Sequence, residues 1–256
     1  MTERVFDSNA SGPIVLGLSL PEGSVRVQVV EGLTSARVVL RTTDKTGPAA
    51  DAVNRARSEQ NGQALGIEVP EMPGNVMMQS RRGNHFVQNI GVVRGSVTGV
   101  TIVNGRVVSG GTGTMQAVSP IEAIVSLPTG SSLGVTGTST DAEVFGYVDQ
   151  MEFRSVSGAL DADGVRRLTA DTTSGHIGVG RITGQISAHS VSGSIDVGLY
   201  DGSSATLNTT SGSVGMQATS AASGHVSAHS VSGSIRLTGT SHLSVSADSV
   251  SGRVRR

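Results

Sequence analysis

A Ser-Gly pair returns at nearly constant intervals through the second half of this 256-residue chain. Its glycines stand at positions 158, 175, 193, 212, 233 and 252, so the intervals are 17, 18, 19, 21 and 19 residues. The octamer AHSVSGSI occurs letter for letter at residues 188–195 and 228–235, which is two such intervals apart. A period of this length is typical of stacked units that cannot bury an apolar face alone. The sequence therefore predicts a solenoid.

Aligning the units on the glycine shows which positions are apolar. The columns seven and five residues before it, and two residues after it, are built from Val, Ile, Leu, Ala, Met and Phe, and the column two residues before it holds Val or Thr. Side chains of a strand alternate between its faces. We therefore expect these columns and the glycine to point inward, and the Ser and Thr columns three and one residues before the glycine to face solvent. Each unit becomes two short strands and a corner, stacked about 4.8 Å from the next.

The first part of the chain predicts a β module with one helix. Apolar residues alternate around residues 14–20, 25–29, 38–40 and 65–69, as in half-buried strands. Pro48 suits the first turn of a helix over residues 48–60, which Asn61-Gly62 would end. Residues 71–118 are irregular and contain a predicted hairpin with Asn104-Gly105 as its turn. We expect an all-β chain in which this N-terminal module, residues 1–118, caps a β-solenoid of about seven coils over residues 119–256.

Two further motifs extend the repeat pattern. SLPEG (residues 19–23) and SLPTG (126–130) share a Leu-Pro-x-Gly turn, and the second precedes TTSGHIGV, SVSGSIDV, TTSGSVGM and SVSGSIRL. With these motifs, residues 119–256 resemble the bacterial putative-adhesin family, a β-strand-repeat domain of unknown function. The N-terminal module is similar to that of actinobacterial members. The resemblance implies a solenoid and no reaction. The chain departs from the family at Thr140-Asp141, where the family's glycine is missing, so we expect a less regular first coil.

Composition excludes several functions. The chain has 19 Lys and Arg against 20 Asp and Glu, and this balance provides no basic face for nucleic acid. It has no Cys, which fits a reducing compartment. The first residues lack a signal-peptide pattern, and no apolar run is long enough to span a bilayer. We therefore expect a soluble, cytoplasmic protein without a transmembrane segment. Gly110-Gly111-Thr112-Gly113 lacks the Lys and the helix of a phosphate loop, so no nucleotide is predicted.

The column four residues before the glycine carries the charged candidates. It reads Gly137, Arg154, Asp171, His189, Asn208, His229 and Asp248. Arg154, Asp171 and His189 would be neighbours on successive coils, where they could perform acid–base chemistry on a polysaccharide. Glycoside hydrolysis usually needs two facing carboxylates, however, so a charge-compensating ladder is favoured. His189 and His229 would lie two coils apart, about 10 Å, which is too far for one metal ion. We predict no catalytic residue, no metal and no cofactor.

Arginines follow the last repeat signature. Arg253, Arg255 and Arg256 either protect an exposed strand edge from pairing or select an acidic partner. We expect a homo-oligomer joined through the C-terminal coil, together with an unidentified protein partner. The favoured function is a non-enzymatic scaffold or protein-interaction module. The alternatives are an adhesin-like, ice-binding or carbohydrate-binding surface protein and a polysaccharide-active enzyme. The candidate interaction surface comprises Arg154, Asp171, His189, His229, Asp248, Arg253, Arg255 and Arg256.

Overall fold

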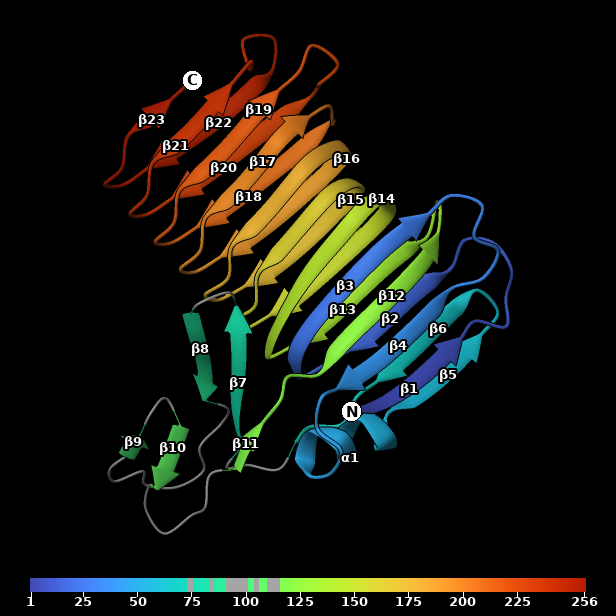
Figure 1. Cartoon of the computed structure of the whole chain (residues 1–256). Helices are drawn as coiled ribbons and strands as arrows, with labels where there is room; N and C mark the ends of the chain where they lie inside the picture. The colour runs from blue at the N-terminus through green and yellow to red at the C-terminus, as the bar shows by residue number, and fades with distance from the viewer. Residues whose placement is uncertain (73–75, 83–84, 91–100, 104–105, 110–115) are drawn as a thin grey trace.

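A computed structural model describes residues 1–72, 76–82, 85–90, 101–103, 106–109 and 116–256 (Figure 1). The chain is all-β apart from one helix, and its C-terminal part forms a β-solenoid of about six turns, where the sequence predicted about seven. Each turn contributes a strand segment to each of two sheets, which we call sheet 1 and sheet 2.

Sheet 1 starts from an antiparallel hairpin and continues with parallel strands. Its order is β5 (Arg57–Asn61), β6 (Ala64–Glu68), β2 (Val15–Ser19), β13 (Ser132–Gly137), the second halves of β14 (Ser139–Ser155), β15 (Leu160–Thr172) and β16 (Ile177–Ser190), then β18 (Ser204–Thr209), β20 (His225–Ser230) and β22 (Ser244–Ser249).

Sheet 2 is built in the same way. Its order is β1 (Thr2–Asp7), β4 (Arg37–Thr42), β12 (Glu122–Pro128), β3 (Glu22–Val30), the first halves of β14, β15 and β16, then β17 (Ile195–Tyr200), β19 (Val214–Ala218), β21 (Ile235–Thr238) and β23 (Val254–Arg255). Segments from both sides of residue 118 alternate here, because β3 lies between β12 and β14. The division at residue 118 stays a prediction, and the hydrogen-bonded sheets are continuous across it.

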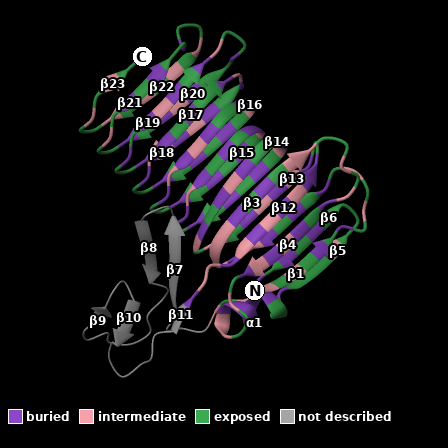
Figure 2. Cartoon of the chain, viewed as in Figure 1, coloured by how far each residue is buried: buried purple, intermediate pink, exposed green. Residues whose placement is uncertain are grey.

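The interior between the sheets is filled by the apolar columns that the repeat alignment predicted. Buried and exposed residues alternate along each strand (Figure 2). Phe153, Leu168, Ile177, Ile195 and Leu207 are among the fully buried side chains, as expected. Thin aliphatic side chains suit two sheets whose separation is fixed by short corners. The same columns become half-buried in the last coil, at Val245, Ala247 and Val254.

The expected orientation of two columns is wrong. Val156 and its equivalents two residues before the glycine face solvent, and Val156 is 51% exposed. The Ser and Thr residues three before the glycine are buried instead, and Ser190 is fully so. The Gly193 N–H donates to Oγ of Ser190 at 2.8 Å, and that hydroxyl donates to the carbonyl of Gly175 on the preceding coil at 3.3 Å. The hydroxyl therefore satisfies backbone groups at the corner, which a buried Val could not do.

Glycine is required at the aligned position because successive coils approach closely there. A Cβ on Gly193 would overlap the carbonyl oxygen of Gly175, and one on Gly175 would overlap that of Gly158. The same overlap recurs at Gly212, Gly233 and Gly252. The buried hydroxyls and these glycines form one ladder along the solenoid, which we call the Ser/Thr–Gly ladder.

The first coil exchanges the two members of this ladder. The pairing Gly137↔Ser155 puts a glycine in the hydroxyl position, and Thr140 pairs with Gly23 in the glycine position. The Thr140 hydroxyl occupies the space above Gly137 and donates to the carbonyl of Leu20. At this corner the hydroxyl therefore comes from Thr140, three residues after the position that carries it in the other coils. The coil keeps its register although the family's glycine is missing.

The N-terminal end is closed by α1 (Pro48–Arg55), which connects β4 to β5. Ala49, Ala52 and Val53 are buried on the predicted face. The expected extension of the helix to residue 60 is wrong, because residues 57–61 pair antiparallel with β6 and thereby extend sheet 1. Asn61-Gly62 belongs to the turn between these two strands, where Gly62 has φ 57°.

The insertion between β6 and β12 contains short strands. β7 (Val76–Arg82) pairs antiparallel with β8 (His85–Ile90) and parallel with β11 (Gln116–Val118). β9 (Thr101–Val103) and β10 (Arg106–Ser109) form the predicted antiparallel pair. The predicted turn at Asn104-Gly105 and the segment Gly110–Gly113 lie outside the described residues. In the described part of the chain, no helix has the length and apolar character needed to cross a membrane.

Candidate functional site

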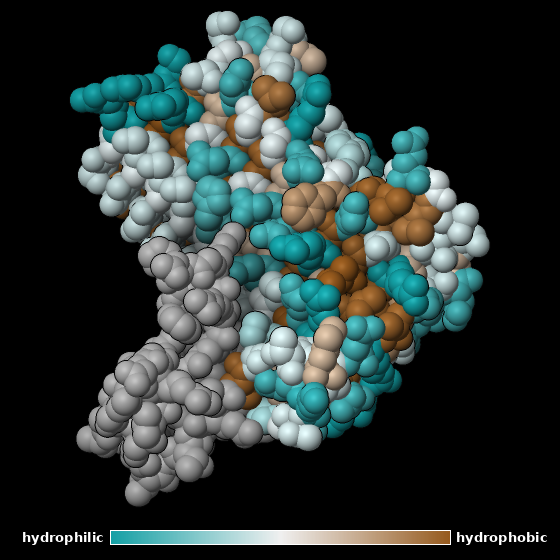
Figure 3. Space-filling model, in the orientation of Figure 1, coloured by the Kyte–Doolittle hydropathy of each residue, from teal (hydrophilic) through white to brown (hydrophobic). Residues whose placement is uncertain are grey.

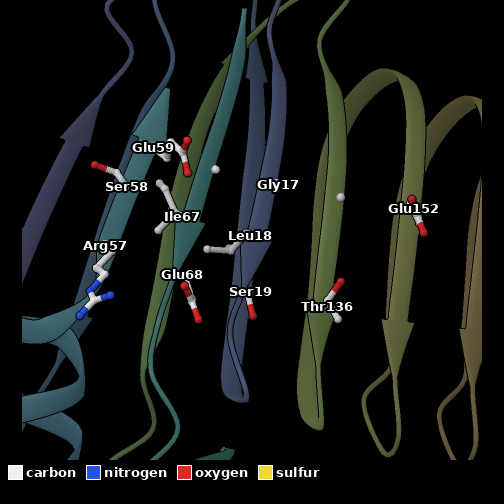
Figure 4. A pocket seen from close by; sticks show the side chains of 12 residues that line it. Gly17, Leu18, Ser19, Arg57, Ser58, Glu59, Ile67, Glu68, Thr136 and Glu152 are labelled. Carbon is white, nitrogen blue, oxygen red and sulfur yellow. The ribbon is translucent and has the colours of Figure 1, made fainter. Parts of the chain in front are cut away.

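A groove of about 820 Å³ lies on the outer face of sheet 1, near the N-terminal end (Figure 4). Its floor is a row of glycines on three neighbouring strands, because Gly66 pairs with Gly17, and Gly17 with Gly134. Glu59 on β5 and Glu152 on β14 stand at the two ends of this row. By strand spacing, the row from Glu59 to Glu152 is about 19 Å long and runs across the strands.

No steric constraint of the fold explains the glycine floor. A Cβ on Gly17 would meet no atom within 4 Å, and on Gly66 or Gly134 it would meet only backbone atoms at 3.7 Å or more. None of the three has a positive φ. Glycine weakens a strand interior, because it costs backbone entropy and has no side chain to pack. Three glycines in one register row therefore keep this surface flat and open at a cost in stability.

Polar side chains line one side of the groove. Arg57, Glu68, Ser19 and Thr136 form the adjacent row, one residue from each of β5, β6, β2 and β13 (Figure 4). Among the described residues, Arg57, Glu59 and Glu68 make no ion pair, whereas Glu152 is paired with Arg154 at 2.8 Å. The site therefore offers the carboxylates of Glu59 and Glu68, the guanidinium of Arg57, which is the register partner of Glu68, and two hydroxyls around an uncharged floor.

The predicted charged column continues this row along sheet 1. Thr136 pairs with Arg154, and the register then runs through Asp171, His189, Asn208, His229 and Asp248. Thr136 holds the place that the alignment gave to Gly137, because Thr140, and not Asp141, stands in the glycine position of the first coil. His229 Nδ1 lies 3.5 Å from Asp248 Oδ2, which is the kind of pair expected of a charge-compensating ladder.

The predicted interaction surface divides between two faces. Arg154, Asp171, His189, His229 and Asp248 all lie on the outer face of sheet 1. Arg253 and Arg255 belong to the last segment of sheet 2, where Arg255 pairs with Arg236. Arg256 turns to the end of the solenoid and donates from Nη2 to the carbonyl of Ala247 at 3.2 Å. The structure therefore does not bring the three arginines to the charged row.

The sequence contains a signal for the groove outside the Ser-Gly repeats, in the form of three short triplets. The triplets Leu16-Gly17-Leu18, Leu65-Gly66-Ile67 and Leu133-Gly134-Val135 each place a glycine between two inward apolar residues. This pattern marks an outward glycine within a strand. Only the pairing of β6 with β2 and of β2 with β13 shows that the three glycines are neighbours.

Three side chains whose pKa values are shifted do not line the groove. A hydrogen bond from Arg166 lowers the pKa of Asp149. Burial raises the pKa of Tyr200 to about 12. Burial, with a smaller contribution from Glu71, raises the pKa of Glu22. These shifts follow from an ion pair and from desolvation within the solenoid.

Comparisons with known proteins give one matching family model and several solved structures of low sequence identity. The family model described as Toastrack DUF4097 matches residues 35–255. A "putative lipid binding protein" from Parabacteroides distasonis ATCC 8503 is similar, with 12% identity, a TM-score of 0.41 and coverage of 100% of this chain and 97% of that chain. A "putative cell adhesion protein" from Clostridium sporogenes ATCC 15579 shows 9% identity, a TM-score of 0.38 and coverage of 99% and 97%. A comparison with curated proteins gives no significant match.

Proposed function

This chain belongs to the Toastrack DUF4097 family, and we propose that it is a non-enzymatic interaction module whose binding site is the groove on sheet 1. The observation that carries the proposal is the glycine row of Gly66, Gly17 and Gly134, which the fold does not require. A flat floor about 19 Å long suits an extended partner chain that lies across the strands. The carboxylates and hydroxyls beside it supply directional contacts, as the few polar groups of a binding site do.

Filling the groove tests this proposal. We expect Gly17→Val, alone or with Gly134→Val, to abolish partner binding without loss of stability, because there is room for the side chain and Val favours strands. The wild type and the variants are immobilised, and proteins retained from an extract of the source organism are quantified by mass spectrometry. Ser187→Val, on the same face but outside the groove, is the matched control. A partner that is retained equally by all variants contradicts the groove as its site.

The alternatives from the sequence meet different physical obstacles. Ice binding rested on two outward hydroxyl columns, but the column that includes Ser190 is buried and bonded to backbone, so the predicted grid loses half its members. Arg154, Asp171 and His189 are exposed on the outer face of sheet 1, and Arg154 is ion-paired with Glu152 at 2.8 Å, which favours the charge-compensating ladder over the polysaccharide-active enzyme. An adhesin-like carbohydrate-binding role stays an alternative. Binding of defined glycans to the wild type but not to Gly17→Val would favour it.

Two further predictions about the chain remain proposals. We propose that it forms a homo-oligomer through its C-terminal coil, where β22 and β23 each pair with one neighbour in the described residues. The half-buried apolar residues of that coil favour additional burial. Cytoplasmic localisation stays a prediction, and cell fractionation with a specific antibody would test it.

A further inference from the structure

One register row on the outer face of sheet 2 carries acidic residues in its middle coils and basic residues in its last two, and its first acidic residue, Glu143, is ion-paired with Arg26 on β3 at 3.1 Å. From β14 to β23, the row reads Glu143, Asp161, Gly178, Asp196, Gly215, Arg236 and Arg255. By strand spacing, this row is about 29 Å long. Its acidic part comes from the earlier coils and its basic part from the last two.

The acidic part surrounds a hollow of about 510 Å³, which we call the acidic trough. Glu143, Asp161, Asp163 and Asp196 line it, and Gly178, Gly180 and Gly198 leave space between them. Asp163 is held in place, since its Oδ2 accepts the Gly146 N–H at 2.9 Å. Asp161 makes no ion pair with any described residue.

The basic part, which we call the arginine patch, comprises Arg236, Arg253 and Arg255. Arg236 and Arg255 are direct register partners, and like charges placed side by side on a sheet are destabilising. None of the three makes a side-chain hydrogen bond or an ion pair within the described part of the chain. Hydrophilic side chains gather at β23 on the molecular surface (Figure 3). The patch thus has unused donors and an electrostatic reason to take an acidic partner.

We propose that the acidic trough and the arginine patch bind each other between two copies of this chain, with the outer faces of sheet 2 packed together. The proposal rests on the proposed homo-oligomer and assigns its contact to the outer face of sheet 2, which includes the C-terminal coil, while the edges of β22 and β23 stay outside the contact. A two-fold axis brings the same face of each copy together in reverse direction. Such an axis, lying between the two packed faces, parallel to the strands and midway between Asp196 and Gly215, reverses the row and places Arg255 of one copy opposite Asp161 of the other.

The neighbouring rows fit the same axis. Because this axis keeps the position of each residue along the strands, Arg253, two residues before Arg255, comes to lie opposite Ala159 of the other copy, two residues before Asp161. Arg236 comes to lie above Gly178, between the carboxylates of Asp161 and Asp196. Asp196 comes to lie opposite Gly215. One axis therefore matches charges with opposite charges and larger side chains with glycines.

Charge reversal on each side gives the decisive experiment. Variant A carries Arg236→Glu and Arg255→Glu, and variant B carries Asp161→Arg and Asp196→Arg. Sedimentation equilibrium should show a wild-type dimer that weakens with added salt, and each variant alone should have a dissociation constant raised at least about tenfold. An equimolar mixture of A and B should form a heterodimer again, because both contact sets regain opposite charges. This recovery also shows that each variant is folded.

Matched controls and contrary results separate the two proposals. Arg167→Glu and Asp171→Arg make the same charge changes on the outer face of sheet 1 and should leave the dimer unchanged. If the wild type forms a dimer that A and B do not weaken, this surface is wrong and the homo-oligomer stands. If the wild type is monomeric at high micromolar concentration, both proposals are wrong. If the monomer binds vesicles containing anionic lipid and variant A does not, the patch serves a membrane surface and the inference is overturned.

Discussion

Gly193→Ala should destabilise the protein by about 3 kcal/mol or more, although it adds one methyl group. The new Cβ would overlap the carbonyl oxygen of Gly175 on the preceding coil. That oxygen is part of the backbone and accepts the Ser190 hydroxyl, so it cannot move aside without breaking the ladder. Relief requires separating two coils over both of their sheets. Denaturant unfolding, followed by circular dichroism, measures the loss.

Gly17→Ala is the matched control for this substitution. Both glycines lie in the β framework, but the added methyl group at Gly17 has no atom within 4 Å. Alanine is less flexible than glycine in the unfolded chain, so stability should stay the same or rise by about 0.5–1 kcal/mol. Equal losses in the two variants would show that close coil contact is not the reason for the aligned glycines.

Ser190→Ala should cost about 1–3 kcal/mol, because it leaves two buried backbone groups without a partner. The Gly193 N–H loses its acceptor and the Gly175 carbonyl loses its donor. Ser192→Ala, two residues further on, removes an exposed hydroxyl and should change stability by less than about 0.5 kcal/mol. Differential scanning calorimetry on both variants compares the positions directly.

Ser190→Thr provides a second control for the ladder. Thr172 occupies the equivalent position on the preceding coil, where its Oγ1 accepts the Gly175 N–H at 3.1 Å and donates to the carbonyl of Gly158 at 3.2 Å. The Thr variant should therefore retain wild-type stability. A loss as large as that of the Ala variant would mean that side-chain volume matters at this position and the hydroxyl does not.

The sequence predicted the solenoid because its strongest constraints are local and repeated. Columns that include Leu168 and Ile177 are apolar in every unit, and alternation alone assigns them to the interior. The corner is different, because Val191 has the more apolar side chain but Ser190 has the atoms that the backbone needs. Hydropathy predicts that Val191 is buried and Ser190 exposed, whereas in the structure Ser190 is buried and Val191 is exposed. A hydrogen-bond count at the turn was needed to place them correctly.

Relations between distant segments were harder to predict. The glycines of β2, β6 and β13 are separated by up to 117 positions in the sequence (from Gly17 to Gly134), and only strand pairing brings them into one row. The missing glycine of the first coil similarly concealed that Thr136, and not Gly137, stands beside Arg154. The arginines of the last coil and the charged column, which the sequence analysis combines in one candidate surface, lie on different faces. The corner between the sheets separates them.

The Ser/Thr–Gly ladder also bears on how such a chain changes in length over evolution. Each hydroxyl reaches only to the coil before it, so a new coil needs nothing beyond one neighbour with the same corner. Duplication of a whole unit preserves every contact at its junctions, whereas insertion of part of a unit breaks them. The identical octamers at residues 188–195 and 228–235 are what copying of a two-coil segment would leave. Length in this architecture is inherited in steps of about 4.8 Å per coil, so lineages can extend the molecule while both ends keep their own structure.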